Sequence, residues 1–487
     1  MKIPRVMSTQ HPDNVQLPFF AENQDMSGND EIQEAYYAFS HLGCDEQMWD
    51  CEGKEVDAYV VRKLLTTYEH FFKQTRLGKD VRLTLRLPNP DVERNEAKVF
   101  VETLDSIPRS CDAASLFYGR DCPPIHEVIL PMTMSAKSLN RVYHYYKDFV
   151  VGKQNKPFYP GDISISEWLG EFKPREISVI PLFEDREHML EAHNIMRAYL
   201  ADKDIGHQRV FLARSDPAMN YGMVSAILCN KIALQRLQRL SRETGVQIYP
   251  ILGAGSAPFR GHLSPETIDM VLKEYSDVQT FTVQSAFKYD HPVAAVRAAI
   301  AKLETSQRSA AREEIDEEKC LQIVDKVSAN YRLLIEHLAP LINHVAPFVP
   351  RRRMRKLHVG LFGYARNVGK TSLPRVISFC AACYSLGLPP EIFGLKSLTD
   401  ADLGCMEDMH VNFLFDTQAA MSFFNEEVLT ILPAEVKRNL RLDWGAYETN
   451  EQHRVITSRI IKAIKNRDNS TLQRDLIEAA HIRKFLG

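Results

Sequence analysis

Two carboxylate side chains follow successive apolar runs and could together bind a metal ion. Glu184 ends the run VIPLFE, and Asp216 follows the next run, VFLARS. If these runs are neighbouring strands of a barrel, both acids lie at the mouth where barrel enzymes place their chemistry. Two carboxylates suit Mg²⁺, with Mn²⁺ as an alternative, because Mg²⁺ keeps waters and takes its other oxygen ligands from substrate. The alternative interpretation is that each acid only caps the following helix.

Several arginines stand where they could bind an anion. A guanidinium group binds carboxylate or phosphate through two parallel hydrogen bonds. If several converge on one mouth, the ligand is a small polyanion that carries both groups; the alternative is that they are solvated surface residues. The candidates lie beside predicted strand ends or glycine-rich loops and are Arg86, Arg120, Arg260, Arg366 and Arg375.

Three further residues occupy predicted strand ends or follow them. His11 closes the first apolar run, Lys137 follows the fourth, and Gln284 ends the eighth. Histidine is the side chain best suited to proton transfer near neutral pH, although a single histidine is more often a hydrogen-bonded structural group. The loop GAGSAPFRG, residues 253–261, could bring backbone N–H groups close to an anion, but it does not match a dinucleotide-binding fingerprint.

Short β-branched runs alternate with helix-like segments, which predicts parallel strands joined by crossover helices. We therefore predict a (β/α)₈ TIM barrel over residues 1–304, carrying the active site, and a mostly helical part over 305–487 that packs on it and contributes substrate-binding arginines. The acidic segment 41–57 is expected to be a lid or a solvated loop. The predicted strands are Arg5–His11, Val81–Leu87, Ala114–Arg120, Glu127–Met132, Ile177–Phe183, Arg209–Ala213, Gln247–Leu252 and Gln279–Gln284.

The bulk properties predict a cytoplasmic enzyme. The net charge of −3 provides no general attraction for nucleic acid or an anionic membrane. No apolar run is long enough for a signal peptide or a membrane span. The nine cysteines, few and odd in number, favour free thiols in a reducing compartment. The single CxxC, Cys380–Cys383, is interpreted as a pair of buried thiols.

The segment FGYARNVGKT, residues 362–371, suggests a nucleotide-binding switch as a rival function. A phosphate-binding P-loop has four residues between its two glycines. Here Gly363 and Gly369 enclose five, and Tyr364 occupies the position that glycine would require. This spacing argues against the nucleotide-binding function.

Five blocks of the sequence together resemble the archaeal-type phosphoenolpyruvate carboxylases over essentially the full length. The blocks are MSTQHPDN, EQMWDCEGKEVD, VIPLFED, FLARSDPAMNYG and GAGSAPFRGHLSP. The resemblance implies a carbon–carbon lyase that joins bicarbonate to phosphoenolpyruvate and gives oxaloacetate and phosphate. It also implies a homotetramer under allosteric control. The nearest alternative is another Mg²⁺-dependent, enolate-forming barrel lyase that acts on a 2-oxo acid.

A fainter similarity to the longer, plant and bacterial type implies roles for single residues. It implies a catalytic role for His11, in Thr9-Gln10-His11-Pro12, metal binding by Glu184 and Asp216, and bicarbonate binding by Arg260. It further implies that Arg86, Arg366 and Arg375 neutralise the phosphoryl group in transfer, with Arg366 as a catalytic residue. Gln284 is also predicted to bind substrate. This chain has Leu252, Ala254 and Met219 where the longer type has a histidine, an arginine and a lysine. We therefore expect either that Arg120 or Lys137 supplies a phosphate ligand or that the phosphate is held more loosely.

Overall fold

Eight parallel strands close into a barrel, which confirms the predicted fold class. The computed structural model describes residues 2–52, 57–309, 314–354, 367–368 and 371–487. Neighbouring strands pair in chain order, and the last strand pairs with the first, with Val6 opposite Phe281. The strands are β1 (Val6–Ser8), β2 (Glu46–Asp50), β3 (Arg82–Arg86), β4 (Glu127–Leu130), β5 (Ser178–Phe183), β6 (His207–Ala213), β7 (Gln247–Gly253) and β8 (Thr280–Val283).

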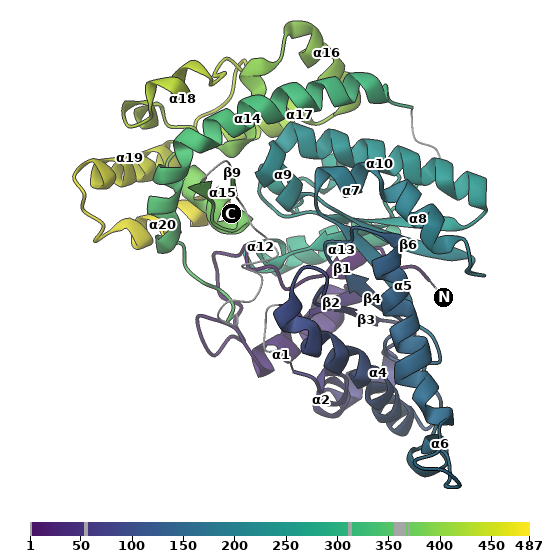
Figure 1. The fold of residues 1–487 in the computed structure, drawn as a ribbon. Helices are drawn as coiled ribbons and strands as arrows, with labels where there is room; N and C mark the ends of the chain where they lie inside the picture. The colour runs from purple at the N-terminus through teal and green to yellow at the C-terminus, as the bar shows by residue number, and fades with distance from the viewer. Residues whose placement is uncertain (1, 53–56, 310–313, 355–366, 369–370) are drawn as a thin grey trace.

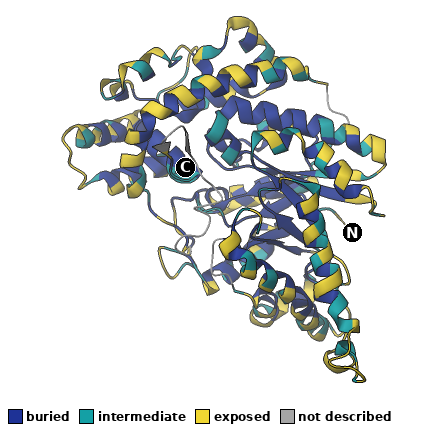
Figure 2. Cartoon of the chain, viewed as in Figure 1, coloured by how far each residue is buried: buried dark blue, intermediate teal, exposed yellow. Residues whose placement is uncertain are grey.

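Helices surround the barrel and continue beyond it (Figure 1). Figure 2 shows that the strands and the helix faces turned toward them are buried, while the outer helix faces are exposed. The α-helices up to the end of the barrel are α1 (Asn29–Tyr37), α2 (Val60–Thr67), α3 (Glu69–Gln74), α4 (Ala97–Tyr118), α5 (Ala136–His144), α6 (Ile165–Leu169), α7 (Arg186–Leu190), α8 (Ala192–Leu200), α9 (Ser215–Tyr221), α10 (Met223–Thr244), α11 (Ile268–Glu274), α12 (Ser285–Tyr289) and α13 (Val293–Thr305).

A second set of helices forms the C-terminal part. The longest of them, α14 (Glu317–Val345), packs on α9 and α10 of the barrel. The Tyr331 hydroxyl donates a 2.6 Å hydrogen bond to the carbonyl oxygen of Met219, and Ser328 Oγ lies 3.1 Å from Ser225 Oγ. A two-stranded ribbon pairs β9 (Asn367–Val368) with β10 (Thr371–Ser372). The helices are α14 (Glu317–Val345), α15 (Val376–Ser385), α16 (Asp400–Met409), α17 (Phe413–Met421), α18 (Ala434–Arg438), α19 (Glu451–Lys465) and α20 (Leu472–Arg483).

Two errors in the predicted strands cancel in the count of eight. The predicted strand Ala114–Arg120 is wrong, because this segment ends helix α4 at Gly119, which has the left-handed φ of 65° typical of a helix C-terminus. The missing strand, β2, lies inside the acidic segment 41–57, which was predicted to be a lid or a loop. That prediction is wrong for Glu46–Asp50, whose five residues are all buried.

Polar residues of β2 and its neighbours fill the interior near the amino-terminal end of the barrel. The guanidinium of Arg209 is fully buried and donates to Glu46 at 2.6 and 2.8 Å and to Glu127 at 2.9 Å. Arg82 also donates to Glu127, at 3.2 Å. Because each charge has a partner, these groups are tolerated in the interior. This ion cluster explains why β2 is a strand despite its polar sequence.

Within the described residues, no individual helix has the length and apolar composition needed to span a membrane. Two consecutive helical segments, Val376–Ser385 and Pro390–Ser397, meet the length and composition criteria only when they are taken together, and they are bent by 99° relative to each other.

Candidate active site

A cavity at the carboxyl-terminal mouth of the barrel brings five predicted site residues together. It encloses about 420 Å³ of space, part of which is open to solvent. Its walls come from the ends of most strands, as expected for a barrel enzyme. Ser215 and Arg214, which the sequence did not single out, also line it. The five predicted residues in its wall are His11, Arg86, Glu184, Asp216 and Gln284.

The two carboxylates predicted to bind metal face this cavity from neighbouring strands. Glu184 follows β5 and Asp216 lies in the first turn of α9, directly after β6; these two strands pair in parallel. Glu184 Oε2 accepts a 2.6 Å hydrogen bond from the backbone N–H of Met132. Burial raises the pKa of Glu184 to about 8; Arg86 opposes this shift, whereas Asp216 and Glu52 add to it.

The donor set of the mouth fits a divalent cation. The pKa of Glu184 is raised mainly because the carboxyl group is buried, and the neighbouring Asp216 and Glu52 add to the shift, so an ionised Glu184 needs a further positive charge beside it. A bound divalent ion would supply that charge. Among the described residues, no group of three or more His, Cys, Asp or Glu side chains is arranged as a metal site. Two carboxylates nevertheless suffice for Mg²⁺, which completes its shell with waters and substrate oxygens.

Arg86 is held at the mouth by acidic residues that the sequence analysis did not identify. Its guanidinium forms ion pairs with Asp50, at 3.6 Å, and with Glu52. Asp50 is the last residue of β2, and its backbone N–H donates a 3.0 Å hydrogen bond to Gln10 Oε1. Both acids lie at a strand end, where barrel enzymes place functional residues. The polar sequence EQMWD does not have the apolar pattern of a buried strand, so this signal was missed.

His11 follows β1, where its ring nitrogen Nδ1 lies 3.0 Å from Thr9 Oγ1. The backbone carbonyl of His11 accepts from the N–H groups of Asp13, at 3.1 Å, and Ser285, at 3.2 Å. These contacts fix the chain on both sides of the imidazole. The ring therefore faces the cavity from an ordered turn.

Arg260 lies behind the cavity wall and is not among the cavity-lining residues. Its side chain is 1% exposed and donates to Asp13 Oδ2 at 3.1 Å and to Ser215 Oγ at 3.2 Å. It also donates to Gln284 Oε1 at 2.5 Å and to the carbonyl of Gly487 at 2.7 Å. In this arrangement the guanidinium orients residues next to His11 and Asp216 and most of its donors are engaged within the protein. Direct bicarbonate binding by Arg260 stays a prediction.

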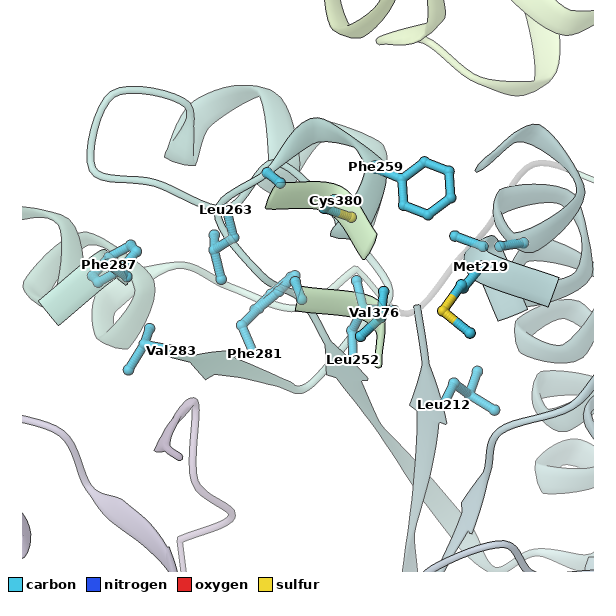
Figure 3. Close-up of a cluster of buried hydrophobic side chains, with 14 of the residues drawn as sticks. Leu212, Met219, Leu252, Phe259, Leu263, Phe281, Val283, Phe287, Val376 and Cys380 are labelled. Carbon is cyan, nitrogen blue, oxygen red and sulfur yellow. The ribbon is translucent and has the colours of Figure 1, made fainter. Parts of the chain in front are cut away.

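The loop that carries Arg260 is fastened to the C-terminal part. Figure 3 shows Phe259 in a cluster of buried hydrophobic side chains that also contains Val376 and Cys380 of α15. The rings of Phe259 and Phe379 have centroids 5.8 Å apart. A Cβ atom at Gly255 would come within 2.8 Å of the Arg260 guanidinium carbon, so glycine is needed for this close approach.

Three of the predicted substrate-binding residues, Arg120, Lys137 and Arg375, are not among those that line the cavity. Arg120 follows the end of α4 and is exposed, so its placement at a strand end is wrong. Lys137 is an exposed residue in the first turn of α5. Arg375 caps α15 and lies close enough to Glu93 to lower the pKa of that acid, which burial and Glu52 raise to about 7. Arg366 lies outside the described residues.

Comparisons with known proteins place the whole chain among one group of enzymes. A family model described as "Phosphoenolpyruvate carboxylase" matches residues 3–487. Proteins of that name from Methanospirillum hungatei and Methanothermobacter thermautotrophicus are 53% and 54% identical over 487 residues, which is 100% of each chain. The protein of that name from Halobacterium salinarum is 48% identical over 493 residues, covering 100% of this chain and 99% of its own.

The solved structures that resemble this chain are more distant. An HpcH/HpaI aldolase from Desulfitobacterium hafniense is 15% identical, with a TM-score of 0.33; the match covers 61% of this chain and 90% of the aldolase. A protein of the HpcH/HpaI aldolase/citrate lyase family from Burkholderia cenocepacia is 13% identical, with a TM-score of 0.34, covering 62% and 93%.

Proposed function

Because this chain belongs to the archaeal-type phosphoenolpyruvate carboxylase family, we propose that it joins bicarbonate to phosphoenolpyruvate. The products are oxaloacetate and inorganic phosphate. One observation carries the proposal: residues predicted as catalytic, metal-binding and substrate-binding line a single cavity at the barrel mouth. These residues are His11, Arg86, Glu184, Asp216 and Gln284.

The proposed reaction has two stages. A bicarbonate oxygen attacks the phosphorus of phosphoenolpyruvate, the bond from phosphorus to the enol oxygen breaks, and carboxyphosphate and pyruvate enolate result. Carboxyphosphate then divides into CO₂ and phosphate, and C3 of the enolate attacks CO₂ to give oxaloacetate. Each stage moves negative charge between oxygen atoms, so positive groups must lie where that charge develops.

Residues of this chain supply those groups. Arg86 projects its guanidinium into the mouth, where it would neutralise oxygens of the transferring phosphoryl group. We propose the same role for Arg366 and Arg375. His11, held by its turn, would donate a hydrogen bond to carboxyphosphate and help it break down. Arg260 and Gln284 would keep the walls around the bicarbonate oxygens in place.

We propose Glu184 and Asp216 as the ligands of a Mg²⁺ or Mn²⁺ ion. When bound, the ion would supply positive charge for the developing enolate oxygen. A cytoplasmic location and a homotetrameric assembly under allosteric control also remain proposals, which extend from the family to this chain.

The decisive experiment measures phosphate release and oxaloacetate formation together. Purified enzyme with Mg²⁺ and phosphoenolpyruvate should release one phosphate for each oxaloacetate, and both should require bicarbonate. Phosphate release without oxaloacetate, with or without bicarbonate, would contradict the proposal.

The alternative function is an enolate-forming barrel lyase that cleaves or condenses a 2-oxo acid. It would use the same pair of carboxylates but would not need a guanidinium for a phosphoryl group. Cleavage of a 4-hydroxy-2-oxo acid, with no activity on phosphoenolpyruvate, would favour this alternative.

A further inference from the structure

A second cavity lies between the barrel and the C-terminal helices. It has room for about one water-sized sphere, about 10 Å³, and is bounded by α11, by the turn at Gly261 and His262, and by the segment from His410 to Asp416. None of the functions proposed above uses it. One residue, Arg214, lines both this cavity and the barrel mouth.

Arg214 lies directly after β6, where the chain passes from the barrel strand into α9. Phe211 and Ala213 belong to the apolar cluster inside the barrel, whereas Val210 and Leu212 pack in the cluster outside it. Side chains of a strand point alternately to opposite faces. Arg214 follows the strand as the N-cap residue of α9, and it lines both the mouth and the second cavity.

The guanidinium of Arg214 is buried and has no ion-pair partner among the described residues. The residue is 2% exposed, and its Nε and Nη1 atoms have no hydrogen-bond partner among the described residues. Nor does it form an ion pair with any carboxylate in the part of the chain that the structure describes. A buried, unpaired charge costs several kcal/mol. A native protein usually satisfies such a group with water or an ion.

The acidic residues of the cavity are engaged by other cations and imidazoles. Glu274 forms an ion pair with Lys231, lies 2.8 Å from Nδ1 of His410 and accepts the Asn412 N–H at 2.9 Å. Asp416 lies 2.6 Å from His262 Nδ1 and 3.5 Å from His410 Nε2. These contacts leave neither carboxylate to pair with Arg214 among the described residues of the cavity.

His410 adds to the positive charge. Burial favours its neutral form, but the facing carboxylates of Glu274 and Asp416 outweigh that effect and raise its pKa. When the imidazole is protonated, three cationic groups face two carboxylates. The net charge of these five groups is then +1. The net positive charge around the cavity therefore favours the binding of a monovalent anion.

We propose that this second cavity binds a small inorganic anion, of the size of a halide ion, as the counter-ion of Arg214. The cavity is enclosed and small, which excludes a larger organic acid. Arg214 precedes Ser215 and Asp216 at the mouth, and Gly261 follows Arg260. Occupancy is therefore expected to stabilise the mouth without the anion touching substrate.

Bromide provides a direct probe, because it scatters anomalously and replaces chloride. Crystals of the wild-type enzyme grown or soaked in sodium bromide should show an anomalous peak beside Arg214, on the side of α11 and α17. A site that holds only water would give no peak and would overturn the proposal. A peak inside the barrel mouth that phosphoenolpyruvate displaces would also overturn it, because Arg214 would then serve the substrate site.

A solution experiment tests the same proposal independently. The unfolding temperature of the wild type should rise with chloride concentration when gluconate keeps the ionic strength constant. Arg214→Gln should abolish this rise, whereas Arg351→Gln, at an exposed arginine, should retain it. An identical chloride response in Arg214→Gln and wild type would contradict the proposal. If Arg214→Gln does not fold, the bromide experiment on the wild type still decides.

Discussion

The backbone N–H of Phe259 donates a 2.6 Å hydrogen bond to Oε1 of Glu391. The same oxygen accepts the Tyr384 hydroxyl, also at 2.6 Å, while Oε2 of Glu391 has no partner among the described residues. A fully buried acid of the C-terminal part thus holds the loop that presents Arg260. Burial raises the pKa of Glu391 to about 7.

This raised pKa predicts a pH-dependent contribution to stability. The folded protein binds the Glu391 proton more tightly than the unfolded chain, so the contribution is complete below about pH 4.5. It is lost as the pH rises through about 7, at on the order of 1 kcal/mol per pH unit. Glu391→Gln keeps the accepting oxygen and cannot ionise. Its free energy of unfolding, measured with urea, should therefore rise relative to that of the wild type as the pH increases from 5 to 8.

The control for this prediction is Glu336→Gln, at an exposed position of α14. It should follow the wild type across the pH range. If Glu391→Gln also follows the wild type, Glu391 is ionised in the folded protein, contrary to the raised pKa.

Asp216→Asn should abolish oxaloacetate formation while the fold survives. Loss of one of two carboxylates weakens electrostatic stabilisation of the enolate, and we expect turnover to fall by about 100-fold or more. Mn²⁺ binding, measured by electron paramagnetic resonance, should weaken in parallel. Asp408→Asn, at an exposed position of α16, serves as the control. Near-normal turnover or Mn²⁺ affinity in Asp216→Asn would remove this residue from the metal site.

His11→Asn should separate the two stages of the reaction. Asparagine leaves phosphoryl transfer to bicarbonate intact but cannot exchange a proton as histidine does. We expect bicarbonate-dependent phosphate release with little oxaloacetate, measured in the same samples. His41→Asn, at an exposed position, should keep the two products equal. Efficient carboxylation by His11→Asn would show that the proposed role of His11 is wrong.

Arg209→Met should destabilise the barrel strongly. It leaves Glu46 buried without its cationic partner, which typically costs 3–5 kcal/mol. Chemical denaturation provides the measurement. The double variant with Arg209→Met and Glu46→Gln should recover part of the loss, because the unpaired charge is gone. A single variant that loses less than about 1 kcal/mol would contradict the role of this ion cluster.

The parts of the fold that the sequence predicted correctly are those with local signals. The strands before Glu184 and Asp216 are continuous apolar runs with a polar end, which is the pattern of a buried parallel strand. Strand β2 lacks this pattern, because Glu46 reaches across the barrel to Arg209, 163 positions away. ASLFYGR has apolar and aromatic residues, yet Gly119 ends a helix there. No local rule distinguishes these cases.

The site residues likewise divide into those with a local sequence signal and those placed by contacts with distant segments. Strand-end position identified Glu184, Asp216 and Arg86, which the cavity brings together. Sequence could not reveal that Arg260 would lie behind the wall, because its partners come from distant segments. The sequence did not single out Arg214 either. Its unusual property, burial of Nε and Nη1 without a hydrogen-bond partner among the described residues, is visible only in the structure.

The network around Arg260 has a consequence for how activity returns during refolding. Its guanidinium joins Asp13 and Gly487, which are 247 and 227 positions away along the chain. Closing such long loops is entropically costly, so these contacts form only after the barrel and the helices beyond it have come together. Catalytic competence should therefore lag behind the recovery of helical signal.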